Sequence, residues 1–145
     1  MPDKRVTVAQ RRVVIERANN CCEYCLSQAR FATQSFAVEH IIPRYAGGET
    51  KLENLALSGF GCNSHKYTKT GALDPQTNTV VPLFNPREQV WSDHFTWDNT
   101  FRYIIDQTAT GRATIEALHL NRPELVNLRR VLHVVGEHPP NLSNL

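Results

Sequence analysis

Phe36 to Lys69 read FAVEHIIPRYAGGETKLENLALSGFGCNSHKYTK, and this stretch decides the fold. Within it, an apolar run ends at Glu39-His40, a turn region rich in Pro and Gly follows, and Asn54 leads a second apolar run. A short polar segment that opens with Cys62-Asn63 comes next. This order predicts a β-hairpin followed by a helix, a layout that can hold one divalent cation against a phosphate.

The boundaries of these three elements follow from local signals. We expect the first strand over residues 36–42, because Pro43 cannot donate a hydrogen bond to a neighbouring strand and stops it. The second strand is short and covers residues 55–57. The helix is expected over about residues 63–69, where Gly71 ends it.

The remaining sequence predicts both helices and strands, so the expected fold class is α+β. No linker separates the parts, and we expect one domain over residues 1–145. Its core would cover about residues 20–70, and a C-terminal elaboration at about residues 72–140 would pack on it. The other expected elements are a helix over residues 8–18 that Thr7 caps, a strand over 79–84, an aromatic hairpin over 91–105 and a helix over 108–120. A last helix is expected to be capped by Asn121, to begin with Pro123 and to end at Gly136.

The composition is that of an ordinary soluble globule, with 41% hydrophobic and 21% charged residues. No apolar run approaches the ~20 residues that span a bilayer, and no signal peptide precedes the first charges. We therefore expect a cytoplasmic protein without membrane contact. The net charge is only +2, so any nucleic acid must be bound by a local basic patch rather than by a global field.

Three polar residues of the core have the chemistry for cutting a phosphodiester bond. That reaction needs a deprotonated water and relief of charge on the leaving oxygen. His40 is the candidate general base, because an imidazole with a pKa near ~6.5 can take a proton from water at neutral pH. Glu39 and Asn63 are candidate ligands for Mg²⁺, or for Mn²⁺ in its place, because such ions prefer oxygen ligands and keep several waters.

Three further residues have expected supporting roles. The Asn54 amide can bridge the hairpin loop and hold the backbone of His40 in place, a contribution through geometry. Lys66 can reach a phosphate oxygen, and Arg44 is a second candidate for that contact.

The pair Glu39-His40 raises a geometric condition. Successive side chains of a regular strand point to opposite faces of the sheet. Both residues can serve one site only if the strand bends or bulges at that point, so we expect such a distortion next to Pro43.

The motif residues are Glu39-His40-Ile41-Ile42-Pro43, Gly47-Gly48, Asn54-Leu55 and Cys62-Asn63-x-x-Lys66, and the likeness continues through Val81–Arg87, Trp91, His94–Trp97 and Gly111–Thr114. In these residues the sequence resembles the HNH endonucleases, the His-Me finger nucleases, and is similar to their small stand-alone bacterial type. The resemblance implies a ββα-metal core and a metal-dependent DNA endonuclease with His40 as general base. The family's final His is replaced by Asn63, as in HNN variants, which keeps an oxygen for the metal.

The cysteines point to a metal before a disulfide, because three of the four fall in Cys21-Cys22-Glu23-Tyr24-Cys25. Many HNH nucleases carry two Cys-x-x-Cys pairs around a structural zinc, which takes four N or S ligands. This chain offers Cys22, Cys25 and Cys62, but Gly59 stands where the fourth Cys is usual. Either His65 or Cys21 completes the set, or zinc has been lost and the cysteines are small buried hydrophobes.

Two other functions are compatible with the sequence. The first is a zinc-stabilised DNA-binding module without catalysis. The second is a degenerate finger that serves as an interaction domain, which the glycine at position 59 favours. No oligomeric state is implied.

Overall fold

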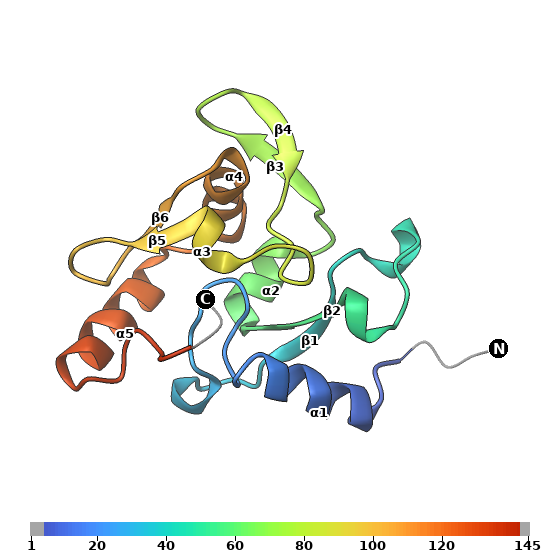
Figure 1. Ribbon diagram of the computed structural model, residues 1–145, viewed down its shortest axis with the longest axis horizontal. Coiled ribbons are helices and arrows are strands. Elements are labelled where there is room, and N and C mark those ends of the chain that lie inside the picture. Colours follow the sequence, from blue (N-terminus) through green and yellow to red (C-terminus); the bar gives the residue numbers. More distant parts are fainter. Residues whose placement is uncertain (1–4, 143–145) are drawn as a thin grey trace.

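A computed structural model describes residues 5–142 and arranges its helices around three small antiparallel sheets (Figure 1). This mixture of helices and small antiparallel sheets agrees with the predicted α+β class. The helices are α1 (Val8–Arg17), α2 (Phe60–Lys66), α3 (Trp91–His94), α4 (Ala109–Leu118) and α5 (Pro123–Val134), with 3₁₀ turns at Ala29–Phe31, Arg44–Ala46 and Leu52–Asn54. The strands are β1 (Ala37–His40), β2 (Leu55–Ser58), β3 (Gly71–Asp74), β4 (Thr79–Pro82), β5 (Phe95–Trp97) and β6 (Ile104–Asp106), paired in sequence order.

Helix α1 begins where its sequence signal predicts. The Thr7 hydroxyl accepts a hydrogen bond from the Gln10 backbone N–H at 3.0 Å, and the Gln10 side chain accepts one from the Thr7 N–H at 3.0 Å. This reciprocal cap satisfies two of the donors that a helix start leaves without partners. The predicted N-cap is therefore confirmed.

The hairpin of β1 and β2 lies between α1 and α2 (Figure 1). All four residues of β2 are buried, as expected for a strand that is covered on both faces. The Arg17 side chain of α1 donates to the Leu52 carbonyl at 2.7 Å and also to that of Leu55, so α1 is tied to the start of β2.

Strand β1 contains no bulge. The register runs without interruption from Ala37 opposite Ser58 to His40 opposite Leu55. Side chains therefore alternate regularly up to His40, and the predicted distortion takes the form of a bend rather than a bulge. The strand ends at His40, earlier than predicted, and the chain bends over the next two residues.

Helix α2 begins at Phe60 and ends at Lys66, so it starts earlier and ends earlier than the predicted helix over residues 63–69. Gly59 is its N-cap and has extended backbone angles. Its end is set by Tyr67, whose φ of 50° and ψ of −116° cannot continue a helix.

The segment after α2 is a second hairpin, of which the sequence predicted only one strand. Gly71 begins β3 rather than stopping a helix, and Asp74 ends it. The buried Asp74 carboxylate accepts hydrogen bonds from Arg112 Nε at 2.9 Å and Nη2 at 3.0 Å. Arg112 lies on α4, and its guanidinium holds the pKa of Asp74 well below its usual range. A tertiary ion pair thus anchors this hairpin, which no local pattern could predict.

The last helix also has a different cap from the predicted one. Arg122 is the N-cap of α5, and the Asn121 side chain instead bonds to β6. Its Oδ1 accepts from the Ile104 N–H at 2.8 Å, and its Nδ2 donates to the Ile104 carbonyl at 2.9 Å. Pro123 opens the helix as predicted, and Gly136 follows its end with a φ of 78°.

One hydrophobic cluster runs through the hairpin region and the C-terminal part. It includes Val14 of α1, Leu57 of β2 and Cys62 of α2, and it continues through Phe84 and Trp91. The two parts of the chain therefore share a core. Within residues 5–142, no helix combines the length and the apolar character that crossing a bilayer requires.

Candidate active site and cysteine cluster

A hollow of about 380 Å³ lies between the end of β1, the turn after it and α2. It brings together four of the residues that the sequence singled out: Glu39, His40, Arg44 and Asn63. Two others, Asn54 and Lys66, do not line it. The remaining lining residues are Pro43, Tyr45, Tyr67 and Thr68.

His40 is half-buried at one wall of this hollow. Its Nε2 lies 2.8 Å from the Thr50 hydroxyl, which fixes the orientation of the ring. Burial lowers the pKa of His40 from its ordinary value, and the nearby Arg44 charge lowers it further. Both effects favour the neutral imidazole, the form that accepts a proton.

Glu39 is almost fully buried, with 7% of its surface exposed. Its Oε1 accepts a hydrogen bond from the Tyr24 hydroxyl. Its Oε2 lies 3.2 Å from Lys66 Nζ, an ion-pair distance, but accepts no hydrogen bond of ordinary geometry. Burial raises the pKa of Glu39, while the Lys66 charge and the Tyr24 hydrogen bond oppose that rise. The site thus contains a buried carboxylate oxygen that can still accept a ligand.

Lys66 does not lie where the sequence placed it. Only 1% of its side chain is exposed, and its Nζ donates to the Ile41 carbonyl at 3.1 Å besides pairing with Glu39. A buried ammonium with these partners cannot reach a phosphate at the surface. The expected phosphate contact is therefore corrected to an internal ion pair, formed because the carboxylate of Glu39 would otherwise be buried without a countercharge.

Asn54 closes the loop between the two strands. Its Oδ1 accepts from the Ile42 N–H at 2.9 Å, and its Nδ2 donates to the carbonyls of Ile42 and Glu49, both at 3.0 Å. The amide therefore holds the backbone just after His40, rather than that of His40 itself. Gly48 lies inside this closed loop, and a Cβ there would stand 1.7 Å from the Ile42 carbonyl oxygen, so only glycine fits.

Two partners of the site were not predicted from the sequence. Thr50 orients His40 from ten residues further along the chain, and Tyr24 reaches Glu39 from the loop after α1. Neither residue belongs to a recognisable spacing pattern. Tyr24 lies between Glu23 and Cys25, and only its complete burial marks it as a core residue.

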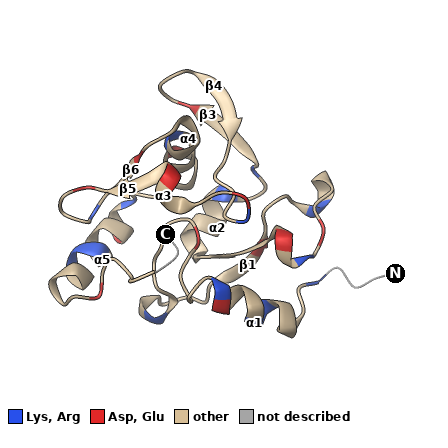
Figure 2. Ribbon diagram, in the orientation of Figure 1, with Lys and Arg blue, Asp and Glu red and all other residues tan. Residues whose placement is uncertain are grey.

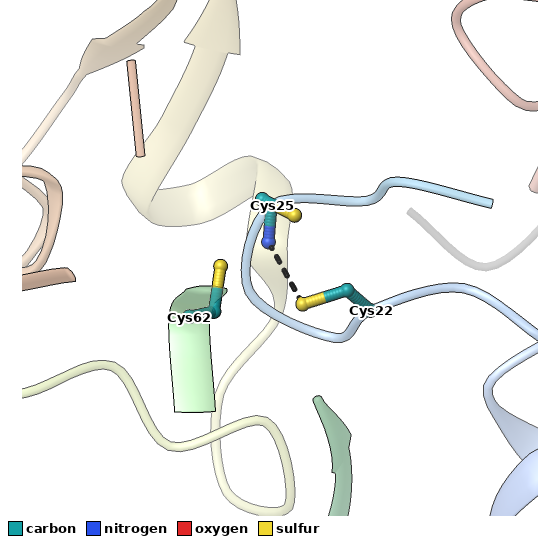
Figure 3. A group of neighbouring side chains, drawn as sticks. All are labelled: Cys22, Cys25 and Cys62. Carbon is teal, nitrogen blue, oxygen red and sulfur yellow. Dashed lines mark hydrogen bonds between the residues drawn. The ribbon is translucent and has the colours of Figure 1, made fainter. Parts of the chain in front are cut away.

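The sulfur atoms of Cys22, Cys25 and Cys62 form a separate cluster, in which all lie within 4.8 Å of one another (Figure 3). Two come from the loop after α1 and the third from α2, and all three are buried. The Cys25 N–H donates to the Cys22 sulfur at 3.5 Å, the interaction dashed in Figure 3. The cluster thus joins the loop to the helix and could hold a metal ion.

Neither proposed fourth ligand belongs to this cluster among the described residues. The His65 ring instead stacks on His119, with 4.2 Å between the ring centroids. Cys21 points elsewhere, and its sulfur lies 3.4 Å from the Asn19 carbonyl oxygen. Both expectations are therefore wrong. The chain supplies three thiols, which fit three of the four positions around a structural zinc.

The pKa values of the three cysteine thiols are shifted in different directions. Hydrogen bonds from Cys22 and Cys62 hold the pKa of Cys25 well below its usual range. Burial raises the pKa of Cys22 to about 12. The Arg122 guanidinium places its Nη1 3.5 Å from the Cys62 sulfur, which adds a positive charge at one side of the cluster. Cys25 is thus the thiol of the cluster that loses its proton most readily, and thiolates are the form that binds zinc.

Position 59 has room for the missing cysteine. A Cβ at Gly59 would lie 3.7 Å from the Cys22 Cβ and 3.5 Å from Phe36 Cε1, which are ordinary contacts. Its φ of −63° and ψ of 155° suit any L-residue. Gly59→Cys is therefore expected to complete a four-thiolate site and to raise zinc affinity by about tenfold or more.

The measurement is the zinc content of purified protein after dialysis against graded chelator. Gly59→Ser is the matched control, because its hydroxyl has a similar size but is a poor zinc ligand. Equal zinc retention by the two variants would contradict the placement of position 59 beside the cluster.

Comparison with protein-family models gave a match to the family described as HNH endonuclease, over residues 22–69. The comparisons with curated proteins and with solved structures gave no match. The matched segment runs from the first cysteine of the cluster to just past α2, and it contains Glu39, His40 and Asn63. The family resemblance read from the sequence is thereby confirmed for residues 22–69, the segment that matches the HNH endonuclease family.

Proposed function

We propose that the protein is a metal-dependent DNA endonuclease whose active site is the hollow between β1 and α2. The observation that carries this proposal is that Glu39, His40 and Asn63 line one hollow inside the segment that matches the HNH endonuclease family. A base and two oxygen ligands at one site are the groups that phosphodiester hydrolysis requires.

His40 acts in this mechanism as the general base. We assign Nε2 as the donor to the Thr50 hydroxyl, which leaves Nδ1 to take the proton of the attacking water. The lowered pKa keeps the ring neutral and ready to accept a proton at neutral pH. The Asn54 amide is a positioning group, since it fixes the backbone that follows His40.

Glu39 Oε2 and the Asn63 amide oxygen would hold Mg²⁺ or Mn²⁺. The residues fit such an ion, because Oε2 is a buried oxygen without a hydrogen bond and both groups offer the oxygen ligands that these ions prefer. When bound, the ion polarises the phosphate and stabilises charge on the leaving oxygen. The Lys66 charge opposes the rise that burial causes in the pKa of Glu39, and so favours the ionised carboxylate.

Arg44 is the residue that we assign to phosphate binding. It lines the hollow, and its charge lies close enough to His40 to lower the pKa of that ring. A guanidinium can bind a phosphate through two parallel hydrogen bonds, which orients the scissile group. Cys22, Cys25 and Cys62 would serve as structural ligands of Zn²⁺ away from this reaction.

The test is cleavage of supercoiled plasmid by the purified protein. We expect nicked or linear product with Mg²⁺ or Mn²⁺ and none with EDTA, because the proposed reaction needs the ion. Asn63→Ala is expected to raise the Mg²⁺ concentration for half-maximal cleavage by about tenfold or more, whereas Ser64→Ala, exposed on the same helix, should not. Full activity in EDTA would contradict metal dependence, and no product with any divalent ion would contradict the nuclease assignment.

A further inference from the structure

Two exposed tyrosines, Tyr45 and Tyr67, line the same hollow as His40 and Asn63. They are 78% and 77% exposed. Among the described residues, neither side chain has a hydrogen-bond partner or packs against another ring. The fold therefore leaves two aromatic faces in water beside the place where we expect the scissile phosphate.

Tyr67 is held there by an unfavourable backbone. Its φ of 50° with a ψ of −116° belongs to a region that favours glycine, although a bulky residue occupies the position. Strain of this kind persists where the surrounding structure imposes it, and it concentrates at functional sites. Glycine would fit this turn at lower cost, so the tyrosine is not explained by the requirements of the turn.

The charge around the hollow is too small for binding through phosphates alone. Arg44 is the one Lys or Arg among its lining residues in the part of the chain that the structure describes, and Lys66 is buried in its pair with Glu39. Elsewhere basic and acidic residues are interspersed along the ribbon, in keeping with the net charge of +2 (Figure 2). Duplex DNA is bound chiefly through many phosphate contacts, which the lining of this hollow does not offer.

We infer that Tyr45 and Tyr67 stack on unpaired bases next to the scissile phosphate, so that the preferred substrate is single-stranded DNA or DNA with an unpaired segment. This inference rests on the proposed function, because it takes the hollow as the place of cleavage. Stacking requires bases that are free of the duplex, since paired bases expose only their edges. Two accessible rings flanking one cation-binding hollow provide that contact without a large basic surface.

The test measures binding separately from cleavage. A fluorescent 12-nucleotide single strand and the corresponding duplex are titrated with protein in EDTA. Wild type is expected to bind the single strand at least about tenfold more tightly. Tyr45→Ala and Tyr67→Ala should each lower single-strand affinity by about tenfold and leave duplex affinity unchanged, whereas each Tyr→Phe variant should keep the wild-type value.

Three controls separate stacking from folding. Tyr67→Gly relieves the strained backbone, so it should fold at least as stably as wild type and still lose single-strand affinity. Tyr103→Ala removes a 45% exposed tyrosine that does not line the hollow and should change neither affinity. A 2-aminopurine placed in the strand should be quenched by wild type and by the Tyr→Phe variants but not by the Tyr→Ala variants.

The outcomes also distinguish this inference from the proposed function. Cleavage by wild type, with single-strand binding unaffected by either Tyr→Ala change, would overturn the inference and leave the nuclease proposal standing. A second outcome is that the wild-type protein cuts no DNA, while the Tyr→Ala variants lose the stacking on bases. That result would support the binding contact and overturn the nuclease proposal.

Discussion

Replacement of His40 by alanine is expected to lower the rate of DNA cleavage by about 10²- to 10⁴-fold, the usual contribution of a general base. The reason is that no second imidazole lines the hollow in the described part of the chain. The change removes one half-buried ring and its bond to Thr50, so the free energy of unfolding should fall only slightly. Single-turnover cleavage at saturating Mg²⁺ is the measurement, with DNA affinity recorded in parallel.

The matched control is His65→Ala. His65 lies on α2 like Asn63, but its ring stacks on His119 and does not line the hollow. This variant should cleave at the wild-type rate, which would show that loss of an imidazole as such is not harmful. A His40→Ala protein that still cleaves at more than about a tenth of the wild-type rate would exclude His40 as the base.

Lys66→Met is expected to destabilise the fold by about 3–5 kcal/mol, the usual cost of removing one partner of a buried ion pair. Methionine keeps most of the volume of the lysine stem but leaves the buried Glu39 without its countercharge. Because the pKa of Glu39 is raised, its carboxyl can take up a proton in the variant, and the neutral form is less costly to bury. The loss of stability should therefore be about 3 kcal/mol at acidic pH and larger at neutral pH. Equilibrium unfolding in urea measures the change.

Two further variants make this result specific. Lys51→Met breaks the pair between Lys51 and Glu49, in which the two side chains are 59% and 63% exposed, and should leave the free energy of unfolding close to the wild-type value. Combining Lys66→Met with Glu39→Gln removes both buried charges and should restore part of the stability, but not cleavage, because Glu39 is a proposed metal ligand. Loss of cleavage in Lys66→Met with unchanged stability would instead support a phosphate contact by Lys66.

The sequence predicts an element well where its determinants are local. Thr7 and Gln10 cap α1 through a pattern that lies within one turn, and the Pro/Gly region between β1 and β2 marks a hairpin connection. The motif residues Glu39, His40 and Asn63 were brought to one hollow because a hairpin followed at once by a helix leaves little freedom in their placement.

The sequence fails where a distant partner decides the outcome. Lys66 looked like a surface cation because its burial depends on Glu39, which lies on another element. Strand β3 was not predicted, because Asp74 finds its partner on α4, many residues away. The tyrosines beside the hollow gave no signal either, since exposure is a property of the whole fold rather than of a short sequence pattern.

The loop clamped by Asn54 has a consequence for how this protein can vary. Surface connections ordinarily accept insertions, because few of their backbone groups are committed to partners. Here the Asn54 amide bonds to the backbone of Ile42 and Glu49 and so fixes the connection, and there is no space at position 48 for a residue larger than glycine. Adding or deleting a single residue between Gly48 and Thr50 would rotate Thr50 away from the His40 ring. Related chains should therefore keep the length of this connection even where its residues differ.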